Sequence, residues 1–371
     1  MSSDLHQTKQ GIREKLRNLV SLHGAPGFEQ NVVAYFRDHA RADSVEVDRY
    51  GNVTATRRGK SDQPRLMISA HLDEIGFIVK GIESNGFLRF DRLGGTADTL
   101  VLCRRVCVNG HFGVTGAKPG HLQSEEEQRR PANVRDMYID IGVDSADEVA
   151  SMGIRVGDPV TFIGELSEFS QGDRVCGKGM DDRYGAAVLL QLLDEMADVQ
   201  PHGTVYAVGT VLEQVGLRGA IMAAYRLQPH YAIAIDGLSA GDTPDCSLTQ
   251  DIPLRMGQGP VVLLAASTGA FRGSIAHPAM KHHLLGAAER SNIPVQLATH
   301  IARGSTEASS IHLVREGIPT ISVGVPRRYS YSANEVIDLN DAARAVKLLL
   351  RFVMEMEQHG ELGFLEHGTS A

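Results

Sequence analysis

The chain of 371 residues is long enough for one large domain or two smaller ones with a well-buried core. Its formal net charge of −8 provides no basic surplus to displace the counterions of a nucleic acid, so we expect no nucleic-acid partner. The content of 42% hydrophobic and 22% charged residues, with 39 glycines, is typical of a globular α/β enzyme.

The sequence also restricts the compartment. No uncharged apolar run approaches the roughly 18 residues that a membrane-spanning helix needs, and the amino-terminal segment lacks the apolar stretch of a signal peptide. The four cysteines are too few for a disulfide scaffold in a chain of this size. We therefore expect a cytoplasmic protein with reduced thiols and no membrane partner.

The first part of the chain is predicted to be α/β. Residues 11–40 place apolar side chains at helical spacing and are interrupted by a turn at 23–27, which predicts two helices. A β-hairpin is expected over 44–56. The apolar run 66–70 is typical of a buried strand, and it ends at His71-Leu72-Asp73.

Between residues 76 and 168 the pattern changes to short β-rich segments separated by glycine turns. We predict a small β-rich domain inserted here, in which the polar segment 121–130 is an exposed loop. Residues 1–75 and 169–371 then form one discontinuous α/β catalytic domain.

From residue 172 onward, helices and strands alternate again. Helices are expected at 185–196, 219–225, 282–291, 308–315 and 341–357, and strands at 204–211, 231–235, 294–299 and 319–323.

Polar side chains lie where several of these elements begin or end. His71 and Asp73 follow one strand, Glu213 and Asp236 follow others, and Asp181 precedes a helix. Because the carboxyl ends of sheet strands meet at one edge, these distant groups can converge. One imidazole and two carboxylates suit a divalent ion such as zinc, manganese or cobalt. Asp73 is placed to hold the second ring nitrogen of His71, and a spare glutamate can take a proton from the water of such an ion.

Each cluster also has a purely structural interpretation. A His-x-Asp is most often a surface or capping feature, and an Asp-Asp pair before a helix is usually an N-cap. The joint placement of the clusters at element ends favours the functional interpretation.

The segments around these residues carry a resemblance. They are SAHLDEIG at 69–76, GKGMDDR at 177–183, LEQVGLRGA at 212–220, Ile235-Asp236 with GDTP at 241–244, and PRRY at 326–329. In this order they resemble the tetrahedral, glutamyl aminopeptidase-like family of cocatalytic metallopeptidases, from about residue 10 to residue 355. The resemblance implies a three-layer α/β zinc-peptidase-like domain, with 76–168 as an inserted barrel-like dimerisation domain, and a homo-oligomer of two or more chains.

The resemblance also implies roles for individual residues. His71, Asp181 and Asp236 look like the ligands of the first of two metal ions, with Asp181 bridging to the second, and Glu213 looks like the general base. Gln214 stands where the family has a second glutamate, and Tyr331 where it has a ligand histidine. An amide and a phenol replace these ligands poorly. We therefore expect one divalent transition metal per chain, manganese, zinc or cobalt.

Within the family, this pattern is similar to that of the 5-nitroanthranilate aminohydrolases. It implies hydrolytic deamination of 5-nitroanthranilate to 5-nitrosalicylate and ammonia by metal-activated water. Tyr331 and Gln214 would then contact the small-molecule substrate, and Arg328 or Arg272 would pair with its carboxylate.

Two alternatives stay open. If Gln214 still coordinates through its carbonyl oxygen, the chain is a metal-dependent aminopeptidase on short peptides. The other alternative is an inactive assembly or binding protein, against which the retention of Glu213 and of the first-site ligands argues.

Overall fold

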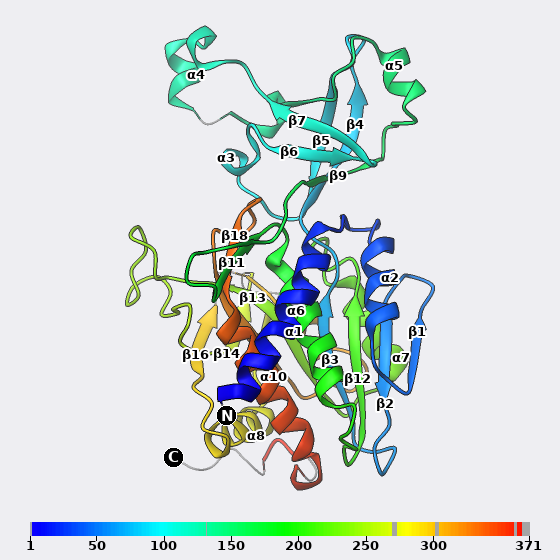
Figure 1. Ribbon diagram of the computed structural model, residues 1–371, viewed down its shortest axis with the longest axis vertical. Coiled ribbons are helices and arrows are strands. Elements are labelled where there is room, and N and C mark those ends of the chain that lie inside the picture. Colours follow the sequence, from blue (N-terminus) through cyan, green and yellow to red (C-terminus); the bar gives the residue numbers. More distant parts are fainter. Residues whose placement is uncertain (1, 131, 269–272, 301–303, 360–361, 366–371) are drawn as a thin grey trace.

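The computed structural model describes residues 2–130, 132–268, 273–300, 304–359 and 362–365. A large α/β body carries a small β-barrel, which projects from one end of the body (Figure 1). No helix among the described residues combines the length and the apolar character needed to cross a lipid bilayer.

The body is organised around a 12-stranded mixed sheet. Its main path runs β1 (Ser44–Val47), β2 (Val53–Arg57), β12 (Thr204–Thr210), β3 (Arg65–His71), β13 (Tyr231–Ser239), β17 (Thr320–Arg328), β18 (Glu335–Asp338), β11 (Arg174–Gly177) and β10 (Ser167–Glu168). β14 (Val261–Ser267) branches off beside β17 and pairs with β15 (Gly273–Ile275) and β16 (Gln296–His300). The central strands β12, β3, β13 and β17 are parallel, so their carboxyl ends share one edge.

Helices cover both faces of this sheet. One face packs against α1 (Ser2–Ser21), α2 (Gln30–His39), α6 (Met180–Glu195), α8 (Pro278–Arg290) and α10 (Leu339–Met354), and the other against α7 (Arg218–Leu227) and α9 (Ala308–Ile311). Successive strand residues face opposite ways: Leu66 and Ile68 lie in the first apolar cluster and Met67 in the second. The expected three-layer α/β architecture is confirmed, and a short turn, η3 (Met356–Gln358), follows α10.

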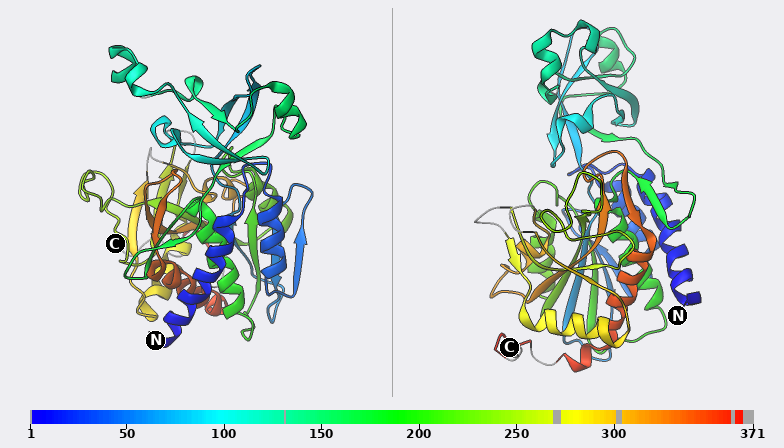
Figure 2. Two further views of the ribbon diagram at one scale, coloured as in Figure 1. Left: turned by 45° about the horizontal axis from the view of Figure 1, so that its top comes forward. Right: turned by 90° about the vertical axis from the view of Figure 1, so that its left-hand side faces the viewer.

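The inserted segment closes into a six-stranded barrel. Its strands are β4 (Gly76–Ile82), β5 (Leu88–Leu93), β8 (Tyr138–Asp140), β7 (His111–Gly116), β6 (Arg105–Val108) and β9 (Pro159–Phe162), in that order. Phe77 packs edge-on against Phe90 and Phe162 in its core, with ring centroids 5.2 and 5.4 Å apart. The short helices α3 (Asp98–Val101) and α5 (Ala146–Ser151) and the turns η1 (Gly120–Leu122) and η2 (Val134–Asp136) connect its strands. The right-hand view of Figure 2 shows the barrel standing clear of the body.

The expectation of a loop over 121–130 is wrong, because α4 (Glu125–Arg129) forms there. Ser124 Oγ accepts the Glu127 N–H at 3.2 Å, and the Glu127 carboxylate accepts the Ser124 N–H at 2.6 Å. This reciprocal capping box satisfies the free amides of the first turn, so that a short polar helix forms in an exposed segment. The Ser-x-x-Glu pattern carries this signal in the sequence.

The bounds of several other elements differ from those predicted from the sequence. β13 continues through Asp236 to Ser239, and β17 continues to Arg328, because these two strands pair with each other along that length. α6 begins at Met180, ahead of the apolar run that predicted it, whereas α9 ends at Ile311, before the expected residue 315. Among the strands of the body, β10, β11, β14, β15 and β18 have no counterpart in the sequence-based prediction.

Candidate functional site

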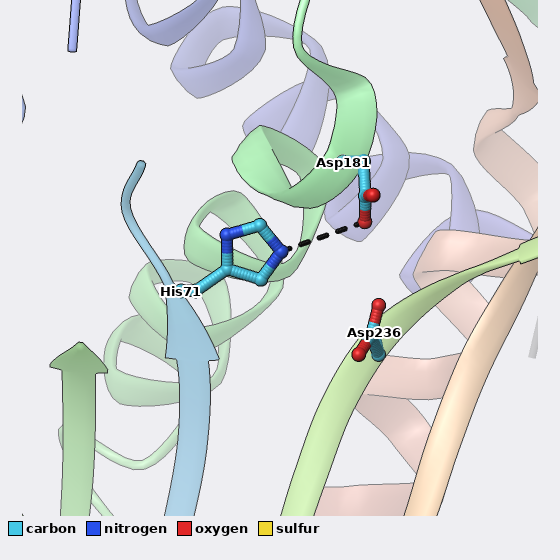
Figure 3. Close-up of side chains that lie close together, drawn as sticks. All are labelled: His71, Asp181 and Asp236. Carbon is cyan, nitrogen blue, oxygen red and sulfur yellow. Dashed lines mark ion pairs between the residues drawn. The ribbon is translucent and has the colours of Figure 1, made fainter. Parts of the chain in front are cut away.

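A histidine and two aspartates converge at the carboxyl edge of the parallel strands. His71 ends β3, Asp236 lies in the adjacent strand β13, and Asp181 lies in the first turn of α6 (Figure 3). One ligand atom from each side chain lies within 4.8 Å of the other two, and all three residues are buried. The convergence expected from the sequence is therefore present in the fold.

The facing atoms of these three side chains fit a metal ion. His71 Nε2, Asp181 Oδ1 and Asp236 Oδ2 are buried without a hydrogen-bond partner among the described residues. His71 Nε2 lies 3.5 Å from Asp181 Oδ1. Buried polar atoms are seldom left unsatisfied, and three of them face one another here. A divalent ion bound to one imidazole and two carboxylates would satisfy all three.

The orientation of His71 is set by its other ring nitrogen. Nδ1 lies 3.0 Å from the backbone carbonyl oxygen of Asp73 and 3.6 Å from Asp73 Oδ1. An Nδ1–H that donates to this carbonyl leaves the lone pair on Nε2, which faces the aspartates. The second ring nitrogen of His71 is therefore held by the backbone oxygen of Asp73 and not, as predicted from the sequence, by the Asp73 carboxylate.

The carboxylate of Asp73 instead holds the loop that carries Glu213. Its Oδ1 accepts the Glu213 N–H at 3.0 Å and its Oδ2 accepts the Gln214 N–H at 2.9 Å. Glu213 Oε2 lies 3.8 Å from His71 Nε2. Asp73 therefore positions the glutamate beside the candidate metal ligands.

Glu213 lies in a setting that favours its protonated form. Burial raises the pKa of Glu213 to about 8; the nearby His71 acts in the opposite direction, and Asp73 and Asp181 add to the rise. A carboxyl group whose pKa lies near neutrality can both accept and return a proton. This is the behaviour required of a general base that later acts as an acid.

The two oxygens of Asp181 face different partners. Oδ1 faces His71, whereas Oδ2 lies 3.0 Å from Arg327 Nη1 and 3.5 Å from Gln214 Nε2. Burial works to raise the pKa of Asp181, but Arg327 and His71 outweigh it and hold the pKa below its usual value. The Asp181 N–H donates to Glu335 Oε2 at 3.1 Å, which fixes the backbone at the start of α6.

Tyr331 lines the cavity together with Asp181. Its ring stacks over the Arg327 guanidinium, 4.8 Å from Cζ to the ring centroid. Its N–H donates to Glu335 Oε1 at 2.7 Å, and its carbonyl accepts from the Thr96 hydroxyl at 2.9 Å. Tyr331 is thereby attached to both the body and the barrel.

A cavity of 430 Å³ opens over these groups. Its lining consists of Gly95, Thr96, Ala97, Asp181, Glu213, Gln214, Gly216, Leu217, Asp236, Thr268, Gly304, Ser305 and Tyr331. This volume is in the range of small-molecule sites, about 300–1,000 Å³. Residues 95–97 come from the barrel segment, so both parts of the chain shape the cavity.

Arg328, one of the two arginines expected to bind a substrate carboxylate, is not among the residues that line this cavity. Arg328 donates from Nε and Nη2 to the two oxygens of Asp242, each at 2.8 Å, so a protein carboxylate already holds its guanidinium. Arg272 lies outside the described residues. Sequence reasoning missed Arg327 and Glu335, because strand pairing decides which residue of the Arg327-Arg328 pair faces the site.

Comparisons with known proteins agree with this architecture. The profile of the M42 glutamyl aminopeptidase family matches residues 51–348. The glutamyl aminopeptidase of Lactococcus lactis subsp. cremoris is 30% identical, over 92% of this chain and 96% of its own length. The structure of aminopeptidase APDkam598 from the archaeon Desulfurococcus kamchatkensis superposes with a TM-score of 0.89 at 35% identity, over 97% of this chain and 99% of that one.

A second solved structure adds an assembly. The Pyrococcus horikoshii TET1 peptidase, which can assemble into a tetrahedron or a large octahedral shell, matches with a TM-score of 0.81 at 31% identity, over 93% of this chain and 99% of that one. Both the profile and these relatives extend across the α/β body and the inserted barrel. This chain therefore belongs to the M42 glutamyl aminopeptidase family of metal-dependent enzymes.

Proposed function

We propose that this chain is a hydrolase that cleaves a carbon–nitrogen bond with one divalent metal ion and Glu213 as general base. The observation that carries this proposal is the set of three unpartnered buried atoms on His71, Asp181 and Asp236, with Glu213 beside them. When bound there, the ion lowers the pKa of a water molecule towards about 7. Manganese, zinc and cobalt all suit this ligand set.

The residues of the chain then handle the proton and the substrate. Glu213 accepts the proton of the attacking water and returns it to the departing nitrogen. Asp73 keeps Glu213 in place through the two backbone amides that it binds. Gln214 and Tyr331 line the cavity and contact the substrate.

For the substrate, we propose an aromatic amine of the 5-nitroanthranilate type. The water oxygen bonds to the ring carbon that bears the amino group, and the electron pair moves into the ring towards the para nitro group. The carbon–nitrogen bond then breaks, and the proton held by Glu213 completes ammonia, which leaves 5-nitrosalicylate. Only one water is consumed and no oxidant is needed.

The support for this substrate comes from Asp181. Its Oδ2 is occupied by Arg327 and Gln214, so the ligand set is suited to one metal ion. A second metal ion, which could bind the free amino group of a peptide, would then lack a ligand on Asp181. Tyr331 supplies an aromatic wall beside the cavity.

Aminopeptidase activity on short peptides is the second candidate. It is supported by family membership and by the activity printed in the names of the relatives. In that reaction the same water attacks the first peptide carbonyl carbon, and Glu213 returns its proton to the leaving amine.

One assay distinguishes the two. The purified protein, loaded with manganese or zinc, is incubated with 5-nitroanthranilate and separately with a panel of aminoacyl chromogenic substrates, and ammonia and released chromophore are measured. We expect stoichiometric ammonia and 5-nitrosalicylate from the first. Release of chromophore from aminoacyl substrates, with no turnover of 5-nitroanthranilate, would establish the aminopeptidase instead.

A homo-oligomer is also part of this proposal. It is supported by the assembly of the TET1 peptidase, which shares this fold. We assign residues 76–168 to the contacts between subunits and residues 1–75 with 169–371 to catalysis.

A further inference from the structure

Arg327 is a buried cation inside the candidate site. Only 1% of its side chain is exposed, although a charged guanidinium is rarely buried without carboxylate partners. It lies near the end of β17, and its Nη1 is 3.0 Å from Asp181 Oδ2 and 2.7 Å from Glu335 Oε1. Two carboxylates therefore neutralise it, and one of them belongs to a candidate metal ligand.

The surroundings are shaped for this guanidinium. The ring of Tyr331 covers it at 4.8 Å. Gly237 leaves room for it on the adjoining strand, since a Cβ there would lie 3.1 Å from both Cζ and Nε of Arg327 and 2.8 Å from Asp181 Oδ1. Glu335 also accepts the N–H groups of Asp181 and Tyr331, so the partner of Arg327 is itself held.

The consequence concerns the second oxygen of Asp181. A metal ion binds a carboxylate oxygen at about 2.0–2.2 Å and needs a free lone pair directed at it. Arg327 Nη1 and Gln214 Nε2 both occupy the side of Oδ2, at 3.0 and 3.5 Å. A second ion on that oxygen would overlap the guanidinium and would face its positive charge at short range in a buried setting.

We propose that Arg327 is the positioning residue that limits the site to one metal ion, with its guanidinium closing Asp181 Oδ2 and supplying the positive charge on that side. This inference rests on the proposed one-ion hydrolase and names the residue responsible for the ion count. Arg327 also holds Asp181 so that Oδ1 remains directed at His71 and Asp236.

The test counts ions rather than turnover. Three full-length variants are compared with the unaltered protein: the double variant Gln214→Glu/Tyr331→His, the triple variant with Arg327→Ala added, and a matched control with Arg328→Ala added to the double variant instead. Arg328 is the neighbouring arginine, but its partner is Asp242 and not Asp181. Each protein is equilibrated with excess Mn²⁺, dialysed and analysed for manganese per chain, and coupling between two ions is sought by electron paramagnetic resonance.

We expect one ion per chain in the unaltered protein, the double variant and the Arg328 control, and two coupled ions in the triple variant. Two ions in the double variant would overturn the proposal, and so would one ion in a folded triple variant. The double variant keeps Arg327 and its two carboxylates, so two ions in it would overturn the proposal even if the triple variant does not fold. Ion counting needs no substrate. If it contradicts the role of Arg327, the assay with 5-nitroanthranilate still tests the proposed function separately.

Discussion

The carboxylates around His71 differ in role because they differ in partners. Asp181 and Asp236 each direct an unpartnered oxygen at the imidazole, whereas Asp73 uses both oxygens to hold backbone amides. Glu213 places Oε2 3.8 Å from His71 Nε2 and borders the cavity. Each group therefore has a separable effect on activity.

Glu213→Gln tests the proton transfer. The amide keeps the shape of the side chain but cannot accept a proton from water, so we expect kcat to fall by at least about 10²-fold. Metal content should stay unchanged, because Glu213 is not among the three converging ligand atoms. Steady-state kinetics on the metal-loaded variant, with manganese analysis as its control, measure both. Unchanged kcat would remove Glu213 from the mechanism.

Glu29 gives a pH dependence of stability. Burial raises the pKa of Glu29 to about 7, with Asp73 adding to the rise, while its side chain accepts the Leu212 N–H at 3.1 Å. In the unfolded chain the pKa is near its ordinary value of about 4.3, so the folded state binds this proton more tightly. The stability due to neutral Glu29 is complete below about pH 4 and is lost as the pH rises through 7.

Glu29→Gln removes this titration while it keeps an acceptor for Leu212. We expect the variant to be more stable than the unaltered protein, by an amount that grows by about 2 kcal/mol between pH 5 and pH 8. Denaturant unfolding of both metal-loaded proteins at these two pH values measures the difference. Stability curves that run parallel from pH 5 to pH 8 would contradict the raised pKa.

At the scale of elements, a buried charge cluster joins three of them. Glu74 follows β3, Lys178 follows β11 and Arg183 lies in α6, and all are at most 1% exposed. Glu74 Oε1 lies 2.7 Å from Lys178 Nζ and 3.1 Å from Arg183 Nη2, and it also accepts the Gly24 N–H at 3.2 Å. This one carboxylate compensates two buried cations next to the site.

Glu74→Ala is expected to cost about 3–5 kcal/mol of unfolding free energy, because it leaves two buried cations without a carboxylate partner. The control is Asp91→Ala, which breaks an exposed ion pair with Lys80 in the barrel, 2.7 Å long, and should cost about 1 kcal/mol or less. Urea denaturation of the two variants compares them directly. Similar losses for both would mean that the cluster is not a source of stability.

The sequence predicted the helices and strands whose apolar residues recur at a clear period, and it missed the short strands that depend on pairing with neighbouring strands. The hairpin β1–β2, the strand β3 and the long helices follow from alternation or helical spacing in their own residues. β18 is four residues long and pairs with β17 and β11, and β14 is held between β16 and β17. Short strands of this kind carry little signal without their neighbours.

At the scale of the whole molecule, the barrel forms a distinct unit that also contributes residues to the cavity. Its first and last strands are adjacent, with Phe77 opposite Val160, so the chain enters and leaves the barrel side by side. Residues 95–97, which connect β5 to α3, reach back to line the cavity. The barrel segment therefore takes part in shaping the cavity.

Replacement of residues 77–162 by a short glycine-serine linker tests this arrangement. We expect the α/β body to fold, because its apolar clusters belong to the body, and we expect a smaller assembly and reduced activity. Light scattering gives the mass, to be compared with multiples of 40.1 kDa for the full chain, and circular dichroism checks the fold. An assembly with the same number of subunits would show that the barrel does not hold the subunits together.

The sequence by itself predicted the candidate ligand types and the candidate general base, and it determined the α/β periodicity, because these reside in local motifs such as His71-x-Asp73 and in the spacing of apolar residues. Only the tertiary structure decided that Arg327, rather than Arg328, faces Asp181, and that Glu335 holds both of them. It also brought residues 95–97 of the inserted segment to the cavity. The physical reason is that the side-chain direction along a strand alternates, and its phase is set by pairing with strands that lie far away in the sequence.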